Sequence, residues 1–143
     1  MSAEPRYQLT VTRAQAEVLR DACELLARCR LGQIADACQQ VLDEHGQAVV
    51  PYDLAQDCEA AIKAEVGLAP NQSWGVGKHP AADLPWDLYQ VLRHRLAWDR
   101  ALAEGHVQPG QARRWPEMMS VCYDEPLFLT PAPHPTLHLI DPA

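Results

Sequence analysis

The feature that most constrains this chain is a capping box followed by apolar residues at helical spacing near its start. Thr12 and Gln15 match the capping-box pattern, in which each side chain hydrogen-bonds the backbone N–H of the other residue. Apolar residues then recur every three or four positions, as on one face of a helix: Val18, Leu19, Ala22, Leu25, Leu26 and Cys29. We expect a helix that begins at Arg13, packs this face on a core and breaks near Gly32.

Similar signals predict three more helices, over residues 34–42, 53–66 and 85–105. Asp53 resembles a second capping-box start, and Gly67 is a natural stop because glycine adopts the left-handed conformation easily. Glu59 and Lys63 are four residues apart, which predicts an exposed ion pair on the third of these helices. Pro85 suits the first turn of the last helix.

Strand-like segments lie at both ends of the chain. Residues 7–11 alternate large apolar and polar side chains, and residues 118–130 and 136–141 look like strands separated by prolines. These observations predict an α+β fold, with about four helices packed on one face of a small antiparallel sheet formed by the N- and C-terminal strands. We expect residues 1–143 to form a single domain.

Composition excludes several classes of protein. Hydrophobic residues make up 48% of the chain and charged residues 22%, which is ordinary globular usage. The net charge of −7 argues against binding to duplex nucleic acid, which needs a basic surface. We find no apolar run of the ~18 residues that a membrane helix needs and no signal-peptide pattern, and expect a soluble, cytoplasmic protein. The five cysteines form no CxxC pair, so we predict neither a metal site nor disulfides.

The last predicted helix combines arginines with aromatic residues and is our main candidate for a binding site. Its predicted core face consists of Leu84, Leu88, Val91, Leu92 and Leu96. Its predicted ligand-binding residues are Trp86, Gln90, Arg93, His94 and Arg100. Guanidinium groups recognise phosphate and aromatic rings stack on bases, so the set suits a nucleotide-like anion. The alternative is structural, with Trp86, Tyr89 and Trp98 completing the core and Arg95 pairing with Asp99.

Two other segments could contribute to the same site. Trp74 and Lys78 flank glycines in a long loop whose amides could hold an anion, although a plain surface loop is the alternative. Arg28 lies near the end of the first helix, where it could bind phosphate or simply complement the helix dipole.

The sequence offers little to support catalysis. Prolines around His134 and His138 forbid the helix that would aim both at one metal, and Ser73 and Ser120 lack the context of a nucleophile. We therefore predict a protein that is not an enzyme, with no catalytic residues and no cofactor.

Residues 7–34, 85–100 and 120–126 carry a resemblance to a known group of proteins. They resemble segments of small accessory proteins encoded by bacteriophages and prophages. The resemblance implies a virus-encoded protein that counters host defences, and some such proteins sequester cyclic nucleotides or cyclic ADP-ribose. It supplies no catalytic residue.

Three functions are therefore open at this point. The first is a homo-oligomeric binder that sequesters a small phosphorylated host immune signal. The second is a protein-interaction inhibitor whose acidic surface binds a host defence or nucleic-acid enzyme. A small hydrolase using Asp87, His94 or the carboxylates at residues 124 and 125 ranks last, because no triad or metal spacing supports it.

Overall fold

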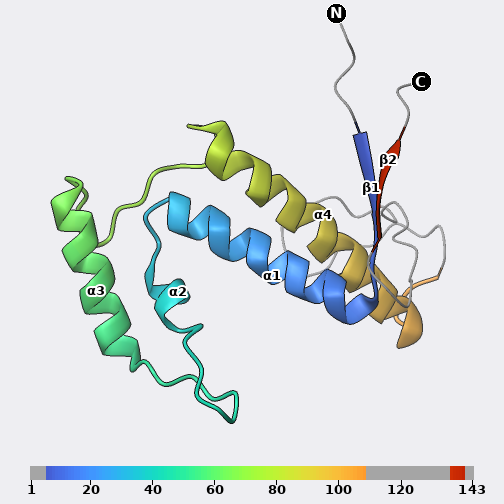
Figure 1. Cartoon of the computed structure of the whole chain (residues 1–143), viewed down its shortest axis with the longest axis horizontal. Coiled ribbons are helices and arrows are strands. Elements are labelled where there is room, and N and C mark those ends of the chain that lie inside the picture. Colours follow the sequence, from blue (N-terminus) through green and yellow to red (C-terminus); the bar gives the residue numbers. More distant parts are fainter. Residues whose placement is uncertain (1–5, 109–135, 141–143) are drawn as a thin grey trace, which may run out of the picture. The chain divides into compact units, whose positions relative to one another are not determined.

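The computed structural model describes residues 6–108 and 136–140, and helices account for most of them (Figure 1). The elements in chain order are β1 (Arg6–Thr10), α1 (Arg13–Arg30), α2 (Ala35–Cys38), α3 (Tyr52–Glu65), α4 (Pro80–Ala103) and β2 (Thr136–Ile140). Helices α1, α3 and α4 contain 18, 14 and 24 residues, whereas each strand contains five.

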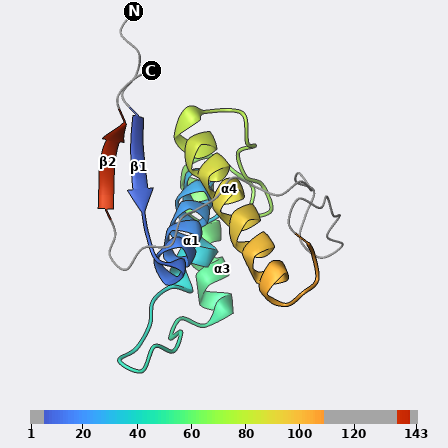
Figure 2. The same ribbon diagram turned by 90° about the vertical axis from the view of Figure 1, so that its right-hand side faces the viewer.

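The predicted α+β fold is wrong. Strands β1 and β2 pair antiparallel, with Gln8 opposite His138, and form a ribbon of two strands (Figure 2). Two strands of five residues offer no face on which four helices could pack. The described part of the chain is mostly helical. The strand expected over residues 118–130 lies outside the described residues.

Contacts along the chain group into two compact units. One contains the described residues 6–20, 90–108 and 136–140, and the other contains residues 21–89, so α1 and α4 each contribute residues to both. The expectation of a single domain stays a prediction. No helix within the described residues is both long enough and apolar enough to cross a membrane.

Helix α1 begins and ends as its sequence predicts. The Thr12 N–H donates to Gln15 Oε1 at 2.9 Å, and the Gln15 N–H donates to Thr12 Oγ1 at 3.3 Å, which completes the capping box. Gly32 ends the helix with a φ of +85°. A side chain there would also be crowded, because an added Cβ would lie 3.3 Å from Leu68 Cδ1.

Two helix starts differ from the predictions. Helix α3 begins at Tyr52 behind Pro51, and no side-chain hydrogen bond caps it, so the second capping box does not form. Helix α4 begins at Pro80, which leaves Pro85 inside the helix. Since proline has no N–H, Pro85 cannot donate to the carbonyl of Ala81 four residues earlier, and the Arg30 guanidinium of α1 donates to that carbonyl instead.

The buried core of the described residues is small and rich in alanine. In the first unit Val11, Ala16 and Leu96 form one cluster, and Trp98 packs with Ala101 and Val107 in another. The alanines at positions 27, 35, 55 and 82 are buried in the second unit. Many larger apolar side chains therefore remain at the surface.

Candidate functional site

A buried ion pair fixes the inner side of α3. The Lys63 ammonium bonds the Glu59 carboxylate, and the two side chains are 5% and 11% exposed. Glu59 Oε2 also accepts a hydrogen bond of 2.7 Å from the Ala35 N–H at the first turn of α2, and Lys63 Nζ donates to the Pro70 carbonyl at 2.9 Å. The predicted Glu59–Lys63 ion pair is therefore confirmed, but its predicted exposure is wrong, because α2 and the loop after α3 need these charges as hydrogen-bond partners.

The pKa of Glu59 reflects this environment. Burial raises the pKa of its carboxyl, but the hydrogen bonds from Lys63 and from the Ala35 amide lower it more, so the pKa lies below its ordinary value. Glu59 is therefore a carboxylate that caps α2 from a neighbouring helix, since α2 has no side-chain cap of its own.

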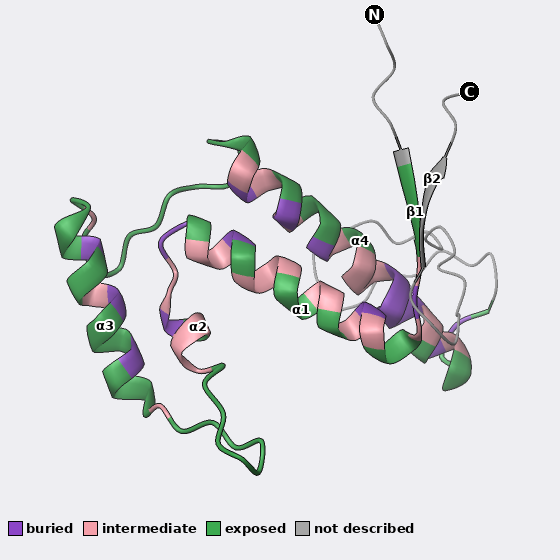
Figure 3. Ribbon diagram, viewed as in Figure 1, coloured by how far each residue is buried: buried purple, intermediate pink, exposed green. Residues whose placement is uncertain are grey.

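A row of apolar side chains lies next to this buried row on α3. Leu54, Cys58 and Ile62 follow one another at intervals of four residues, and Val66, the C-cap residue of α3, continues the spacing, so the four form one ridge along the helix. All four are exposed, Leu54 and Val66 to 51% and Ile62 to 43%. We call these four residues the apolar row; Figure 3 shows α3 mostly in the colour of exposed residues.

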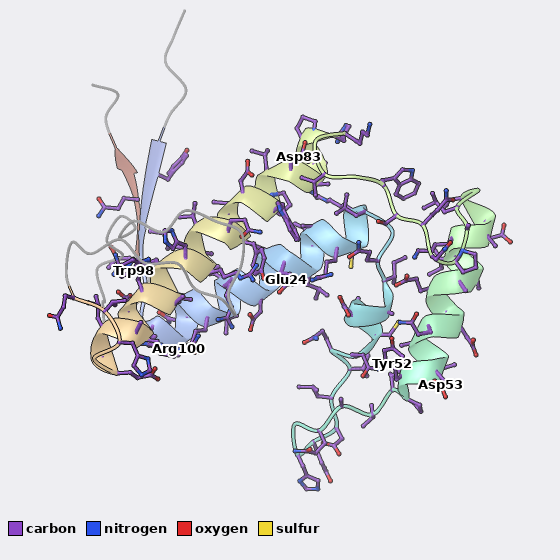
Figure 4. All side chains as sticks on the ribbon, turned by 180° about the vertical axis from the view of Figure 1, so that it is seen from behind. Glu24, Tyr52, Asp53, Asp83, Trp98 and Arg100 are labelled. Atoms are coloured by element: carbon purple, nitrogen blue, oxygen red, sulfur yellow. The ribbon has the colours of Figure 1, made fainter. Side chains whose placement is uncertain are left out.

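Acidic side chains lie beside the apolar row, on the side away from the buried ion pair. Asp53, Asp57 and Glu65 belong to a second ridge with the same four-residue spacing, completed by Ala61, and all are exposed. Asp53 is labelled at the first turn of α3 in Figure 4. We call Asp53, Asp57 and Glu65 the acidic row. Lys63 is the single basic residue in the sequence of α3 and is buried, so the exposed face of this helix is acidic and apolar.

Helices α1 and α4 expose apolar residues in the same way. Leu84, Leu88 and Val91 of α4 are each more than half exposed, and so is Val18 of α1. The predicted core face of α4 is therefore wrong except at Leu96, which is buried, and Leu92, which is half-buried. The predicted core face of α1 is confirmed only in part: Leu19, Leu25 and Cys29 are half-buried and Leu19 packs on a core cluster, but Val18, Ala22 and Leu26 are exposed, and the buried residues are Ala16 and Ala27.

The Arg28 guanidinium, which we predicted to bind phosphate, already contacts two carboxylates and one side-chain amide. Its Nε and Nη2 donate to Glu24 Oε1 at 2.9 and 2.7 Å, its Nη1 donates to Gln33 Oε1 at 2.9 Å, and Asp36 lies 3.4 Å from Nε. The hydrogen bond with Glu24 is the main reason that the pKa of Arg28 is raised. Arg28 therefore joins α1 to the segment that leads into α2.

Two residues of the loop that contains Trp74 and Lys78 also donate backbone hydrogen bonds to residues outside it. The Trp74 N–H donates to the Leu31 carbonyl at 3.0 Å, and its ring lies over Gly32. The Gly77 N–H donates to Asp83 Oδ1 at 2.7 Å, which uses one of the amides expected to hold an anion. Lys78 is exposed.

Some of the α4 residues that we predicted to bind a ligand instead contact neighbouring side chains of the same helix. The ring of Trp86 lies 5.4 Å from that of Tyr89, and the Trp98 indole donates to His94 Nε2 at 2.9 Å. Tyr89 and Trp98 are buried and Arg95 pairs with Asp99, as the structural alternative predicts.

The remaining predicted residues differ in exposure. Arg93 is half-buried, and Arg100 is exposed (Figure 4). Gln90 Oε1 is buried and accepts no hydrogen bond among the described residues.

The eight predicted ligand-binding residues are not gathered in one unit. Arg28, Trp74, Lys78 and Trp86 belong to the unit of residues 21–89, whereas Gln90, Arg93, His94 and Arg100 belong to the other. Within the described residues there is also no group of three or more His, Cys, Asp or Glu side chains that could hold a metal ion.

Sequence reasoning missed the apolar row on α3. The signal is present, since Leu54, Cys58, Ile62 and Val66 share one four-residue spacing directly beside the row of Ala55, Glu59 and Lys63. The assumption that charged residues face water placed Glu59 and Lys63 at the surface, and no side was assigned to the apolar row.

No protein-family model, curated protein or solved structure matches this chain. The resemblance to phage-encoded accessory proteins stays a prediction.

Proposed function

We propose that this chain is a protein-binding module that captures a basic protein partner through exposed apolar side chains bordered by acidic ones. The observation that carries the proposal is the outer face of α3, where the apolar row and the acidic row lie side by side and exposed. Monomeric proteins seldom leave contiguous apolar patches open unless the patches bind something.

Binding through this face would draw on both apolar contact and charge. Covering a fully exposed large apolar side chain stabilises a complex by about 1.5–3 kcal/mol. The apolar row supplies three such side chains besides Cys58, each about half exposed, so each contributes roughly half of that. The loss of translational and rotational freedom on association costs at least about 4 kcal/mol, so the apolar row alone does not hold a partner and the charges beside it must contribute. The acidic row and the net charge of −7 would speed the encounter with a basic partner and reject acidic ones.

Sequestration of a phosphorylated signal stays a prediction with less support. Arg28 already bonds Glu24 and Gln33, and the Gly77 amide already donates to Asp83. An anti-defence role is compatible with either activity, because a module that captures a basic host enzyme would inhibit it by occupying its surface.

Affinity purification from bacterial cells at low and high salt, followed by mass spectrometry and calorimetry with the purified partner, tests the proposed function. We expect a basic protein that binds the isolated chain directly and is released as salt increases. Absence of any direct protein partner, together with release of a small phosphorylated molecule on heating the purified chain, would contradict it.

A further inference from the structure

Resting on this proposed function, we infer that the partner element bound by α3 is an amphipathic helix that carries lysine or arginine along one flank. The apolar row forms one ridge, and a ridge of i, i+4 side chains packs best into the grooves of another helix. Recognition of this kind is common where one helix lays its apolar face on a receptor.

The length of the row sets the size of the partner segment. Leu54 and Val66 are twelve residues apart in sequence, which corresponds to about 18 Å along a helix. A partner helix of about three to four turns would cover the row, with apolar residues at three- and four-residue spacing.

The charges of α3 determine which flank of the partner must be basic. Asp53, Asp57 and Glu65 border the apolar row on one side, and the other side is the row of Ala55, Glu59 and Lys63 that is buried. Positive charge is therefore required along one flank of the bound helix.

The same charges argue against a second copy of α3 as the occupant. In an antiparallel pair of identical helices each flank meets its own equivalent, so Asp53 and Asp57 of one copy would approach the acidic row of the other. Like charges along the whole contact oppose that pairing. In a parallel pair the acidic row of one copy would have to contact the row of Ala55, Glu59 and Lys63 on the other, and that row is already buried.

A synthetic peptide provides a direct probe. We would titrate the full chain into a fluorescein-labelled 18-residue helical peptide with leucines on one face and lysines along one flank, and measure fluorescence anisotropy. A scrambled peptide of equal composition and a peptide with glutamate in place of lysine serve as controls. We expect the first peptide to bind and both controls to bind at least about tenfold more weakly, which is about 1.4 kcal/mol.

Substitutions on the chain locate the site. Ile62→Ser and Asp57→Lys should each weaken binding about tenfold, and Asp57→Lys should also flatten the salt dependence. Val49→Ser and Glu44→Lys are the matched controls, because both residues are exposed outside α3, and they should change binding less than about twofold. Circular dichroism and thermal unfolding verify that each variant folds.

Each other outcome overturns the inference. Equal binding of the scrambled peptide would reduce recognition to charge alone, and binding unaffected by Ile62→Ser would move the contact away from α3. A dimer in sedimentation that Ile62→Ser dissociates would assign the row to a second copy. No peptide binding would also overturn it. The proposed function survives all of these outcomes if a purified basic partner still binds, and it fails separately if none does.

Discussion

Helix α3 and the last turns of α4 both bury charged side chains, but they differ in the apolar side chains that they bury beside them. Helix α3 buries Glu59 and Lys63 and exposes Leu54 and Ile62, whereas α4 buries Arg95 together with the apolar residues Leu96, Ala97 and Trp98 that follow it. The difference follows from what each helix meets. The first turn of α2 presents an amide that needs an acceptor, so Glu59 turns inward, while the Trp98 indole finds its acceptor on its own helix at His94. Helical spacing therefore predicts a helix more securely than it predicts the buried face.

Removing the largest buried side chain of α4 should have the greatest effect on stability. Trp98 is 0% exposed and packs with Ala101 and Val107, so Trp98→Ala leaves a cavity and should cost about 3–5 kcal/mol of unfolding free energy. Urea denaturation followed by circular dichroism measures this. A loss below about 1 kcal/mol would mean that Trp98 is not a core residue and would remove the contrast with α3.

Breaking the ion pair of α3 should cost nearly as much. Lys63→Met leaves the Glu59 carboxylate buried without its cation, which should destabilise the protein by about 3 kcal/mol. The double variant Glu59→Gln, Lys63→Met removes both charges and should lose less than Lys63→Met alone. Chemical denaturation of the three proteins gives the comparison, and equal losses in both variants would show that the charges are not coupled.

The stability of α3 should also depend on pH through Glu59. Its pKa in the folded protein lies below the ordinary value of 4.5, so its contribution is fully present above pH 4.5 and is lost as pH falls through the lower folded pKa. Unfolding free energies measured at pH 7, 4.5 and 3 should fall more steeply for the wild type than for Glu59→Gln. Parallel curves for the two proteins would contradict the inward position of this carboxylate.

Polar substitution in the apolar row should have the smallest effect. Leu54 is half exposed, so Leu54→Ser should lower the unfolding free energy by only about 1 kcal/mol. The matched comparison is Leu96→Ala in the buried part of α4, which should cost about 2–5 kcal/mol. Thermal unfolding of both variants distinguishes them, and a large loss for Leu54→Ser would place this row in the core.

The sequence predicts the helix ends better than the helix surroundings. The capping box at Thr12 and the stop at Gly67 depend on local backbone geometry, and both are confirmed. The predicted start of α4 is wrong, because the helix begins at Pro80 and tolerates Pro85 as its sixth residue. Arg30, which is distant in sequence, donates to the carbonyl that Pro85 cannot bond. Such a contact is not visible in local sequence.

The candidate site could be predicted only in part. The interaction hypothesis follows from the acidic charge, but the position of the surface depends on Glu59 facing α2, which is a tertiary contact. The pairing of Arg28, by contrast, is visible in local sequence, because Glu24 lies one helical turn before it and binds it.

The central claim is that the apolar row of α3 is open in the folded protein, and Cys58 in the middle of that row allows the most direct test. Cys23 and Cys29 are partly buried, and burial raises the pKa of both thiols, whereas Cys58 is exposed. Since alkylation requires an accessible thiolate, iodoacetamide should modify Cys58 several times faster than Cys23 or Cys29 in the native protein, as followed by peptide mass spectrometry. Protection of Cys58 to the level of Cys23 would show that the row is covered and would contradict the account.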